Sequence, residues 1–218
     1  MTHRTRNSRD PQQVPAIAAR LLVEGTARSF GDAKQKAAAL LGVSRLPDNR
    51  TVLAALMDYQ RLFEGPALSA RNSRLRDAAR SAMRAFALFE PRLTGPVLYG
   101  TTLHSSPVCL HLFADEVESV TRCLLQHRIP YQLDTRELHL STRDVANYPV
   151  FRLARDEIDF EFVAMPRQRL SQAPLSPLDG LPYQRVNAAQ LDLMFAADPG
   201  GVWITSQGRL NHALHSLR

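Results

Sequence analysis

The chain has 218 residues, of which 44% are hydrophobic and 22% are charged. This balance fits one globular domain or two small ones, and it excludes an intrinsically disordered chain and a collagen. No apolar run approaches the roughly 20 residues of a membrane-spanning helix, and the first ten residues hold no apolar signal-peptide core. The sequence therefore predicts a soluble, cytoplasmic protein without a membrane partner, whose two cysteines are free thiols.

The net charge of +6 is unevenly distributed along the chain. Residues 1–92 contain 16 Lys and Arg against 8 Asp and Glu, whereas residues 93–218 contain 11 against 13. The positive excess in the first part indicates either a solvated basic surface or a polyanionic partner such as a nucleic acid.

The N-terminal part is predicted to be helical after a disordered tail. Residues 1–13 are polar and basic, so they are expected to form that tail. In residues 14–66, apolar side chains recur every three or four positions in three groups, which predicts a region of three short helices. Gly42 is expected to end the second helix, and Asp48 or Asn49 to cap the third.

The longest predicted helix covers residues 68–90 and follows a break at Gly65-Pro66. Arg76, Arg80 and Arg84 succeed one another four residues apart on one of its faces. Like charges at this spacing repel slightly unless something covers them. We therefore interpret the stripe as solvated, as paired within the chain, or as a contact for nucleic-acid phosphate.

Beyond Pro91 the pattern changes to mixed helix and strand. Residues 96–99 are predicted to form a strand that ends at Gly100. Asp115 is expected to begin a helix, with Glu118 as its capping-box partner. The remaining predictions are strands over 108–113, 131–140, 150–154 and 158–164, an irregular crossover over 165–185 that packs on the sheet, a helix from Asn187 to Ala197, and a C-terminal tail over 199–218.

Three short segments in the second part of the sequence are similar to those of a known superfamily. They are Pro-Val-Leu-Tyr-Gly-Thr (96–101), Ser-Ser-Pro-Val-Cys-Leu-His-Leu-Phe (105–113) and Ile-Asp-Phe-Glu-Phe (158–162). In this order they resemble the nucleotidyltransferase-like superfamily, which has a Gly-Ser turn after its first strand and an Asp-x-Asp pair on its second. The chain also resembles a group of uncharacterised bacterial proteins that place a helical region ending in Tyr-Gln-x-Leu-Phe, here residues 59–63, before this core.

The resemblance implies an α+β fold, with a helical N-terminal region followed by a small mixed β-sheet flanked by helices over residues 67–198. It also implies a function, because the family's carboxylates hold Mg²⁺, which neutralises a nucleoside triphosphate and activates the acceptor. Mg²⁺ and a nucleoside triphosphate are therefore the expected cofactor and substrate if the protein is active.

The residues at the matching positions depart from the family pattern. The resemblance places the Asp-x-Asp pair at Pro107 and Cys109, on the same face as His111, and none of these is an anionic oxygen ligand. The candidates that remain are Asp159 and Glu161 as catalytic residues, these two and Asp115 as magnesium ligands, and Gly100, Thr101 and Ser105 as nucleotide contacts.

Three hypotheses about function follow. The first is a nucleotidyltransferase-like protein that lacks the catalytic carboxylate pair and serves as a binding or regulatory protein for a nucleotide, a nucleic acid or a protein. The second is an active Mg²⁺-dependent nucleotidyltransferase that uses Asp159 and Glu161. The third is a nucleic-acid-binding protein that contacts phosphate through its basic N-terminal helices. The missing carboxylate pair favours the first.

Overall fold

The computed structural model describes residues 10–210. The chain forms two compact units, Met1–Glu64 and Gly65–Arg218, and its class is α+β, with a mixed sheet in the second unit. Residues 1–9 of the predicted tail lie outside the described residues, and the rest of that segment is ordered, because Asp10 caps a short 3₁₀-helix, η1 (Pro11–Gln13).

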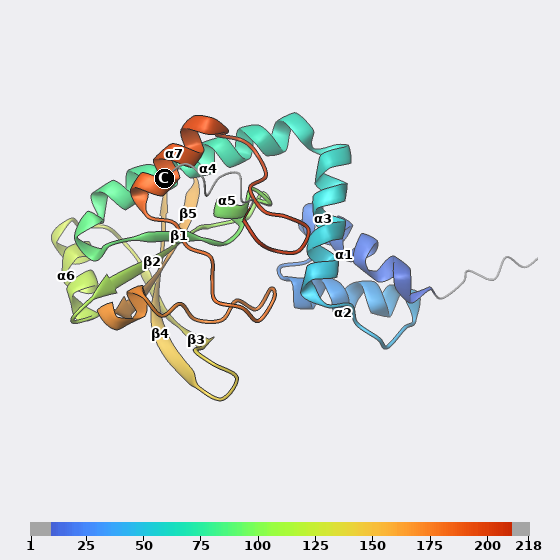
Figure 1. The fold of residues 1–218 in the computed structure, drawn as a ribbon, viewed down its shortest axis with the longest axis horizontal. Coiled ribbons are helices and arrows are strands. Elements are labelled where there is room, and N and C mark those ends of the chain that lie inside the picture. Colours follow the sequence, from blue (N-terminus) through green and yellow to red (C-terminus); the bar gives the residue numbers. More distant parts are fainter. Residues whose placement is uncertain (1–9, 211–218) are drawn as a thin grey trace, which may run out of the picture. The chain divides into compact units, whose positions relative to one another are not determined.

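The first unit contains the three predicted helices, α1 (Val14–Val23), α2 (Phe30–Leu41) and α3 (Asn49–Phe63). Helix α1 contacts both α2 and α3 (Figure 1). Two predicted helix boundaries are confirmed: Gly42 ends α2 with a left-handed φ of 66°, and the Asp48 carboxylate caps α3 by accepting the Thr51 N–H at 2.7 Å.

The positive charge of the first part of the sequence does not lie on these helices. Residues 10–64 carry seven Lys and Arg against six Asp and Glu. Helix α4 (Gly65–Ala85) of the second unit carries five Arg against one Asp. The excess that suggested basic N-terminal helices therefore belongs mainly to α4 and to residues 1–9, which are outside the described part of the chain.

The second unit is built around a five-stranded sheet in the order β1-β2-β5-β4-β3. Strands β2 and β5 are parallel, and the other neighbouring pairs are antiparallel. Its further elements are η2 (Ala87–Phe89), β1 (Arg92–Thr94), α5 (Gly95–Tyr99), β2 (Val108–Ala114), α6 (Glu118–Gln126), β3 (Gln132–His139), β4 (Val145–Arg155), β5 (Ile158–Pro166), η3 (Arg167–Leu170) and α7 (Ala188–Ala197).

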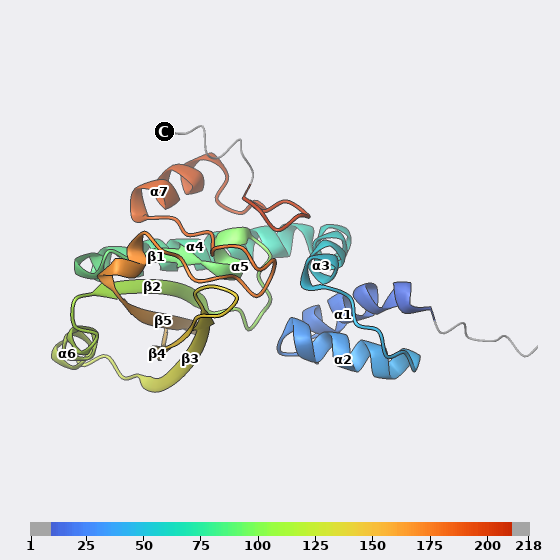
Figure 2. The same cartoon turned by 60° about the horizontal axis from the view of Figure 1, so that its bottom comes forward.

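The sheet buries its two faces differently. Helix α4 packs against β2 on one face, and α7 packs against α4 (Figure 2). Phe86, just beyond α4, meets Phe162 of β5 edge-to-face, with ring centroids 4.9 Å apart. On the other face, the crossover after β5 places Leu170 and Tyr183 against a cluster that includes Phe113 and Val163. The prediction that the crossover packs on the sheet is confirmed.

Three predictions of local structure are wrong. Residues 96–99 belong to helix α5 rather than to a strand, because Pro96 suits a first helical turn and Gly100 caps the helix in the left-handed region. Gly65-Pro66 begins helix α4 instead of ending α3. Helix α6 begins at Glu118 without a side-chain cap, because the N-cap position is held by Val117, and Asp115 pairs with Arg167 at 3.4 Å.

The segment predicted as a C-terminal tail is part of the second unit as far as residue 210. Trp203 is 1% exposed, and Ile204 and Leu210 are buried and pair in a β-bridge. The Trp203 N–H donates to the Tyr99 carbonyl at 2.8 Å, which joins this segment to the end of α5. Residues 211–218 lie outside the described residues.

Helix α7 confirms the prediction for residues 187–197. The Asn187 side chain accepts the Gln190 N–H, and the Gln190 side chain accepts the Asn187 N–H, which completes a capping box. Among the described helices, none combines the length and the apolar character needed to cross a membrane.

Candidate functional site

The register of the sheet brings the sequence candidates Cys109 and Glu161 side by side. Cys109 of β2 lies opposite Glu161 of β5, and Glu161 lies opposite Arg152 of β4. Because residues two apart on a strand share a face, His111 points the same way as Cys109. We call the side of the sheet that carries Cys109, His111 and Glu161 the Glu161 face.

Both carboxylate oxygens of Glu161 are bound by arginines. Arg136 Nη2 donates to Oε2 at 2.7 Å, and Arg152 Nε donates to Oε1 at 3.1 Å. Arg152 also pairs with Asp134 at 2.9 Å, so these four side chains form a continuous chain of charges across β3, β4 and β5. Because the Glu161 side chain is only 16% exposed, these ion pairs are screened less than surface pairs and hold the carboxylate in place.

Cys109 and His111 are both neutral at physiological pH. Burial, reinforced by the neighbouring Glu161, raises the pKa of the Cys109 thiol to about 12. Burial, followed by the charges of Arg185 and Arg136, lowers the pKa of His111 to about 3. The His111 ring packs edge-on against Tyr183, with centroids 5.4 Å apart, and its buried Nδ1 has no hydrogen-bond partner within the described residues.

The residues of the Glu161 face do not suit Mg²⁺, which requires hard oxygen ligands in octahedral geometry. A neutral thiol and a neutral imidazole stand beside a carboxylate whose two oxygens already bind arginines. Between residues 10 and 210, no three His, Cys, Asp or Glu side chains gather closely enough to hold a metal ion.

Asp115 is remote from the other two magnesium-ligand candidates. It follows the C-terminal end of β2, whereas Asp159 lies near the N-terminal end of the parallel strand β5. The seven residues of β2 span roughly 20 Å at about 3.3 Å per residue. Asp115 instead lines a separate cavity of about 300 Å³ with Arg122 and Arg167.

The Gly100-Thr101 turn is packed into the second unit rather than set beside Cys109. A Cβ on Gly100 would lie 2.3 Å from the Gly201 carbonyl oxygen, so only glycine fits there. The turn that adjoins Cys109 is the one after β1, because a Cβ on Gly95 would lie 3.8 Å from the Cys109 Cβ. The Gly100-Thr101 turn, for which a nucleotide contact was predicted, therefore does not adjoin Cys109.

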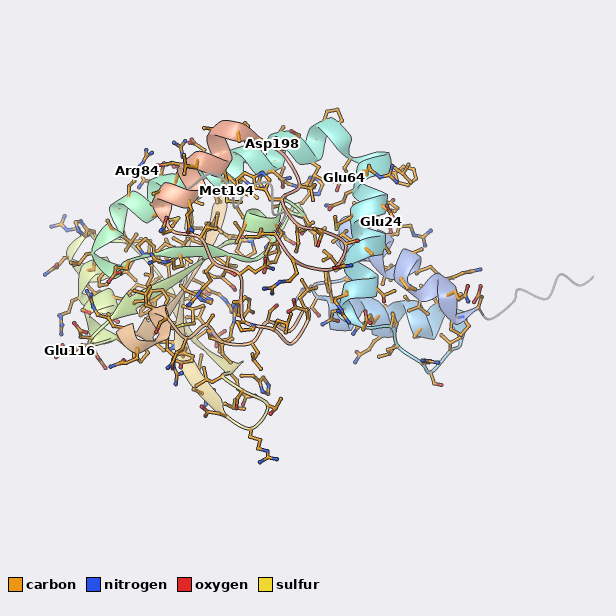
Figure 3. All side chains as sticks on the ribbon, in the orientation of Figure 1. Glu24, Glu64, Arg84, Glu116, Met194 and Asp198 are labelled. Atoms are coloured by element: carbon orange, nitrogen blue, oxygen red, sulfur yellow. The ribbon has the colours of Figure 1, made fainter. Side chains whose placement is uncertain are left out.

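The arginine stripe of α4 is used inside the second unit. Arg76 is fully buried, donates to the carbonyls of Val97, Leu98 and Pro199, and stacks on Trp203 with its Cζ 3.3 Å from the ring centroid. Figure 3 marks the exposed end of the stripe at Arg84. Arg80 and Arg84 both pair with the same carboxylate, Asp192 of α7.

These contacts support one of the three interpretations of the stripe, pairing within the chain. The buried guanidinium of Arg76 is not open to a phosphate, and the other two share an acidic partner. Arg84 remains 62% exposed, so nucleic-acid contact through the stripe stays a prediction that rests on this residue.

Three predicted site residues do come together. Ser105, Asp159 and Glu161 line one cavity of about 580 Å³ at the end of the sheet where β2 and β5 begin. Ser105 and Asp159 also line an adjoining cavity of about 400 Å³ beneath α4. Unlike Glu161, the exposed Asp159 carboxylate has no ion pair or hydrogen bond within residues 10–210.

Sequence reasoning missed Arg136, Arg152 and Tyr183, which surround Glu161 and His111. The two arginines lie on β3 and β4, and they reach Glu161 of β5 because β4 pairs with both β3 and β5. The strands predicted over 131–140 and 150–154 contain both arginines, but a predicted strand does not specify its partner.

Comparison of the chain with protein-family models, with curated proteins and with solved structures found no match.

Proposed function

We propose that the second unit is a nucleotidyltransferase-like binding or regulatory module that has lost the carboxylate pair needed for transfer. One observation carries this proposal: neutral Cys109 and His111 stand on the strand next to Glu161, and Glu161 itself is held by two arginines. Two of the three segments that carry the resemblance, 105–113 and 158–162, contribute to the adjacent parallel strands β2 and β5.

The charge balance supports binding rather than transfer. Two metal ions between a triphosphate and its acceptor need several carboxylates to hold them. Around Glu161 no such set of carboxylates is present, because Arg136 and Arg152 pair with Glu161 and Asp134 and so balance the charge of the cluster without a metal ion. An anionic ligand can be held by arginines directly, without a cation and without chemistry.

The test is a transfer assay combined with a binding assay on the full chain. The protein is incubated with Mg²⁺ or Mn²⁺, with each of the four nucleoside triphosphates labelled at the α-phosphate, and with RNA, DNA and protein acceptors. Binding of the same nucleotides is measured by calorimetry. We expect no labelled acceptor, and we expect nucleotide binding that persists when EDTA is added.

Glu161→Gln is the informative variant, and Glu116→Gln is its matched control, because Glu116 is exposed and lines another cavity. Metal-dependent transfer that is abolished in Glu161→Gln and retained in Glu116→Gln would overturn the proposal. That result would instead establish the active enzyme that uses Asp159 and Glu161.

A further inference from the structure

Two adjoining cavities form one groove at the end of the sheet where β2 and β5 begin. The larger has a volume of about 580 Å³ and the smaller about 400 Å³, and both are lined by Ser105 and Asp159. Volumes of this size are typical of sites for small organic ligands. We call these two cavities together the Asp159 groove.

Asp159 lines both cavities of the groove and is exposed. It stands where the two cavities adjoin, and within residues 10–210 it makes no hydrogen bond or ion pair. An ionised carboxylate only accepts hydrogen bonds, and its two oxygens suit two parallel N–H donors. The groove therefore offers a bidentate acceptor to a ligand that presents two adjacent N–H groups.

The larger cavity is suited to a flat ring. Pro107, Pro130 and Tyr131 contribute apolar surface to its lining. The Tyr131 ring is fixed by an edge-to-face contact with Phe151, with centroids 5.3 Å apart. A heterocycle in this cavity can pack on the apolar surface of the lining while its polar edge binds the carboxylate.

The smaller cavity is suited to an anionic group. Arg74 Nη2 donates to the Asp156 carbonyl at 3.0 Å and lies 4.0 Å from the carboxylate of Glu157, whose side chain is 95% exposed. The Arg74 guanidinium is more than half exposed, and its ion pair with Glu157 of the same cavity is long at 4.0 Å. Its remaining donors and the Ser105 hydroxyl can serve a phosphate.

We propose that the Asp159 groove binds a guanine nucleotide, with the base in the larger cavity and the phosphates toward Arg74. Guanine presents N1–H and the exocyclic N2 amino group side by side, which matches a carboxylate. Adenine presents an amino group beside the acceptor N1, which a carboxylate repels. This inference rests on the proposed function, since it names the nucleotide class that the module binds.

The experiment compares diphosphates of guanosine, inosine, xanthosine and adenosine by calorimetry on the full chain. GDP is expected to bind about tenfold more tightly than IDP, which lacks the N2 amino group, and more tightly still than XDP or ADP. Asp159→Asn replaces one acceptor oxygen by a donor amide, so it should weaken GDP about tenfold and strengthen XDP. Arg74→Gln should weaken GDP and IDP equally, and it should leave guanosine unchanged.

Matched controls come from the same unit. Asp115→Asn alters an exposed carboxylate in another cavity, and Arg84→Gln alters an arginine of α4 that is as exposed as Arg74. Neither should change any of the affinities.

Equal affinity for GDP, IDP, XDP and ADP would overturn the guanine assignment and leave the proposed function intact. The same conclusion would follow if Asp159→Asn left the ratio of the GDP and XDP affinities unchanged. The series on the unmodified chain decides the question even if a variant fails to fold. Failure of all four diphosphates to bind at millimolar concentration would also overturn the inference. The proposed binding function would then require a nucleic-acid or protein ligand. Metal-dependent transfer in the separate transfer assay would overturn the proposed function itself.

Discussion

Replacing the buried Arg76 by methionine should strongly destabilise the second unit. In the folded protein Arg76 Nε, Nη1 and Nη2 donate to the carbonyls of Val97, Pro199 and Leu98 at 3.0, 3.0 and 3.2 Å. Methionine keeps the apolar stem but leaves all three carbonyls without these donors. Burial lowers the pKa of Arg76 to about 9, so the guanidinium is still charged at pH 7 and keeps every donor.

The size of the effect follows from the groups left unpaired. A buried polar group without its partner costs about 1–3 kcal/mol, and loss of the cation–π contact with Trp203 costs about 1–2 kcal/mol. Allowing for partial relaxation, we expect the free energy of unfolding to fall by about 3–5 kcal/mol. Arg76→Lys should recover little of this, because one ammonium cannot reach three carbonyls in a planar fork.

The assay is equilibrium unfolding in urea followed by tryptophan fluorescence. Trp203 is the single tryptophan of the chain and is buried beneath Arg76, so its emission reports on the second unit alone. Arg84→Met is the matched control, since Arg84 lies on the same helix, is 62% exposed and should contribute less than about 1 kcal/mol. A loss below about 1 kcal/mol for Arg76→Met, or one no larger than that of the control, would refute the reasoning.

The remaining predictions concern buried titratable groups and the C-terminal segment. His111 stays neutral in the folded protein down to about pH 3 but takes up a proton near pH 6.5 when unfolded. The free energy of unfolding should therefore fall by about 1.4 kcal/mol per pH unit on acidification within this window. Thermal unfolding from pH 7 to 4 should show this slope in the unmodified chain and lose it in His111→Phe; equal slopes would contradict the assignment. Burial raises the pKa of both thiols, to about 12 for Cys109, so iodoacetamide at pH 8 should modify Cys123 first, which peptide mapping by mass spectrometry can decide. A chain that ends at Asp198 should lose cooperative unfolding of the second unit by circular dichroism, because it lacks Trp203 and the Pro199 carbonyl that binds Arg76; unfolding as cooperative as that of the intact chain would show that residues 199–210 are dispensable.

Local signals in the sequence located most elements and missed those with weak or conflicting signals. Gly42, Asp48 and Asn187 marked helix ends correctly, because a cap depends on one side chain or one backbone conformation within a few residues. Residues 96–99 were misassigned because Val-Leu-Tyr favours strands, while a five-residue helix is too short to show a helical period.

The candidate site was harder to predict than the fold. The neutral character of the 107–111 strand could be read directly from its residue types, and it suggested the loss of a metal site. The pairing of Glu161 with Arg136 and Arg152 could not be predicted from the sequence. It joins three strands, and local sequence signals do not specify the order of strands in a sheet. The same limit applies to Arg76, whose carbonyl partners are up to 123 residues away.

By itself the sequence determined the helical first part, the mixed second part and the absence of carboxylates where the resemblance requires them. Tertiary structure decided which charges remain available. In helix α4, Arg80 and Arg84 pair with Asp192 and Arg76 donates to backbone carbonyls, whereas Asp159 is left without a partner between residues 10 and 210. Charge is counted along a chain, but its neutralisation depends on distances of 3–4 Å that only folding sets.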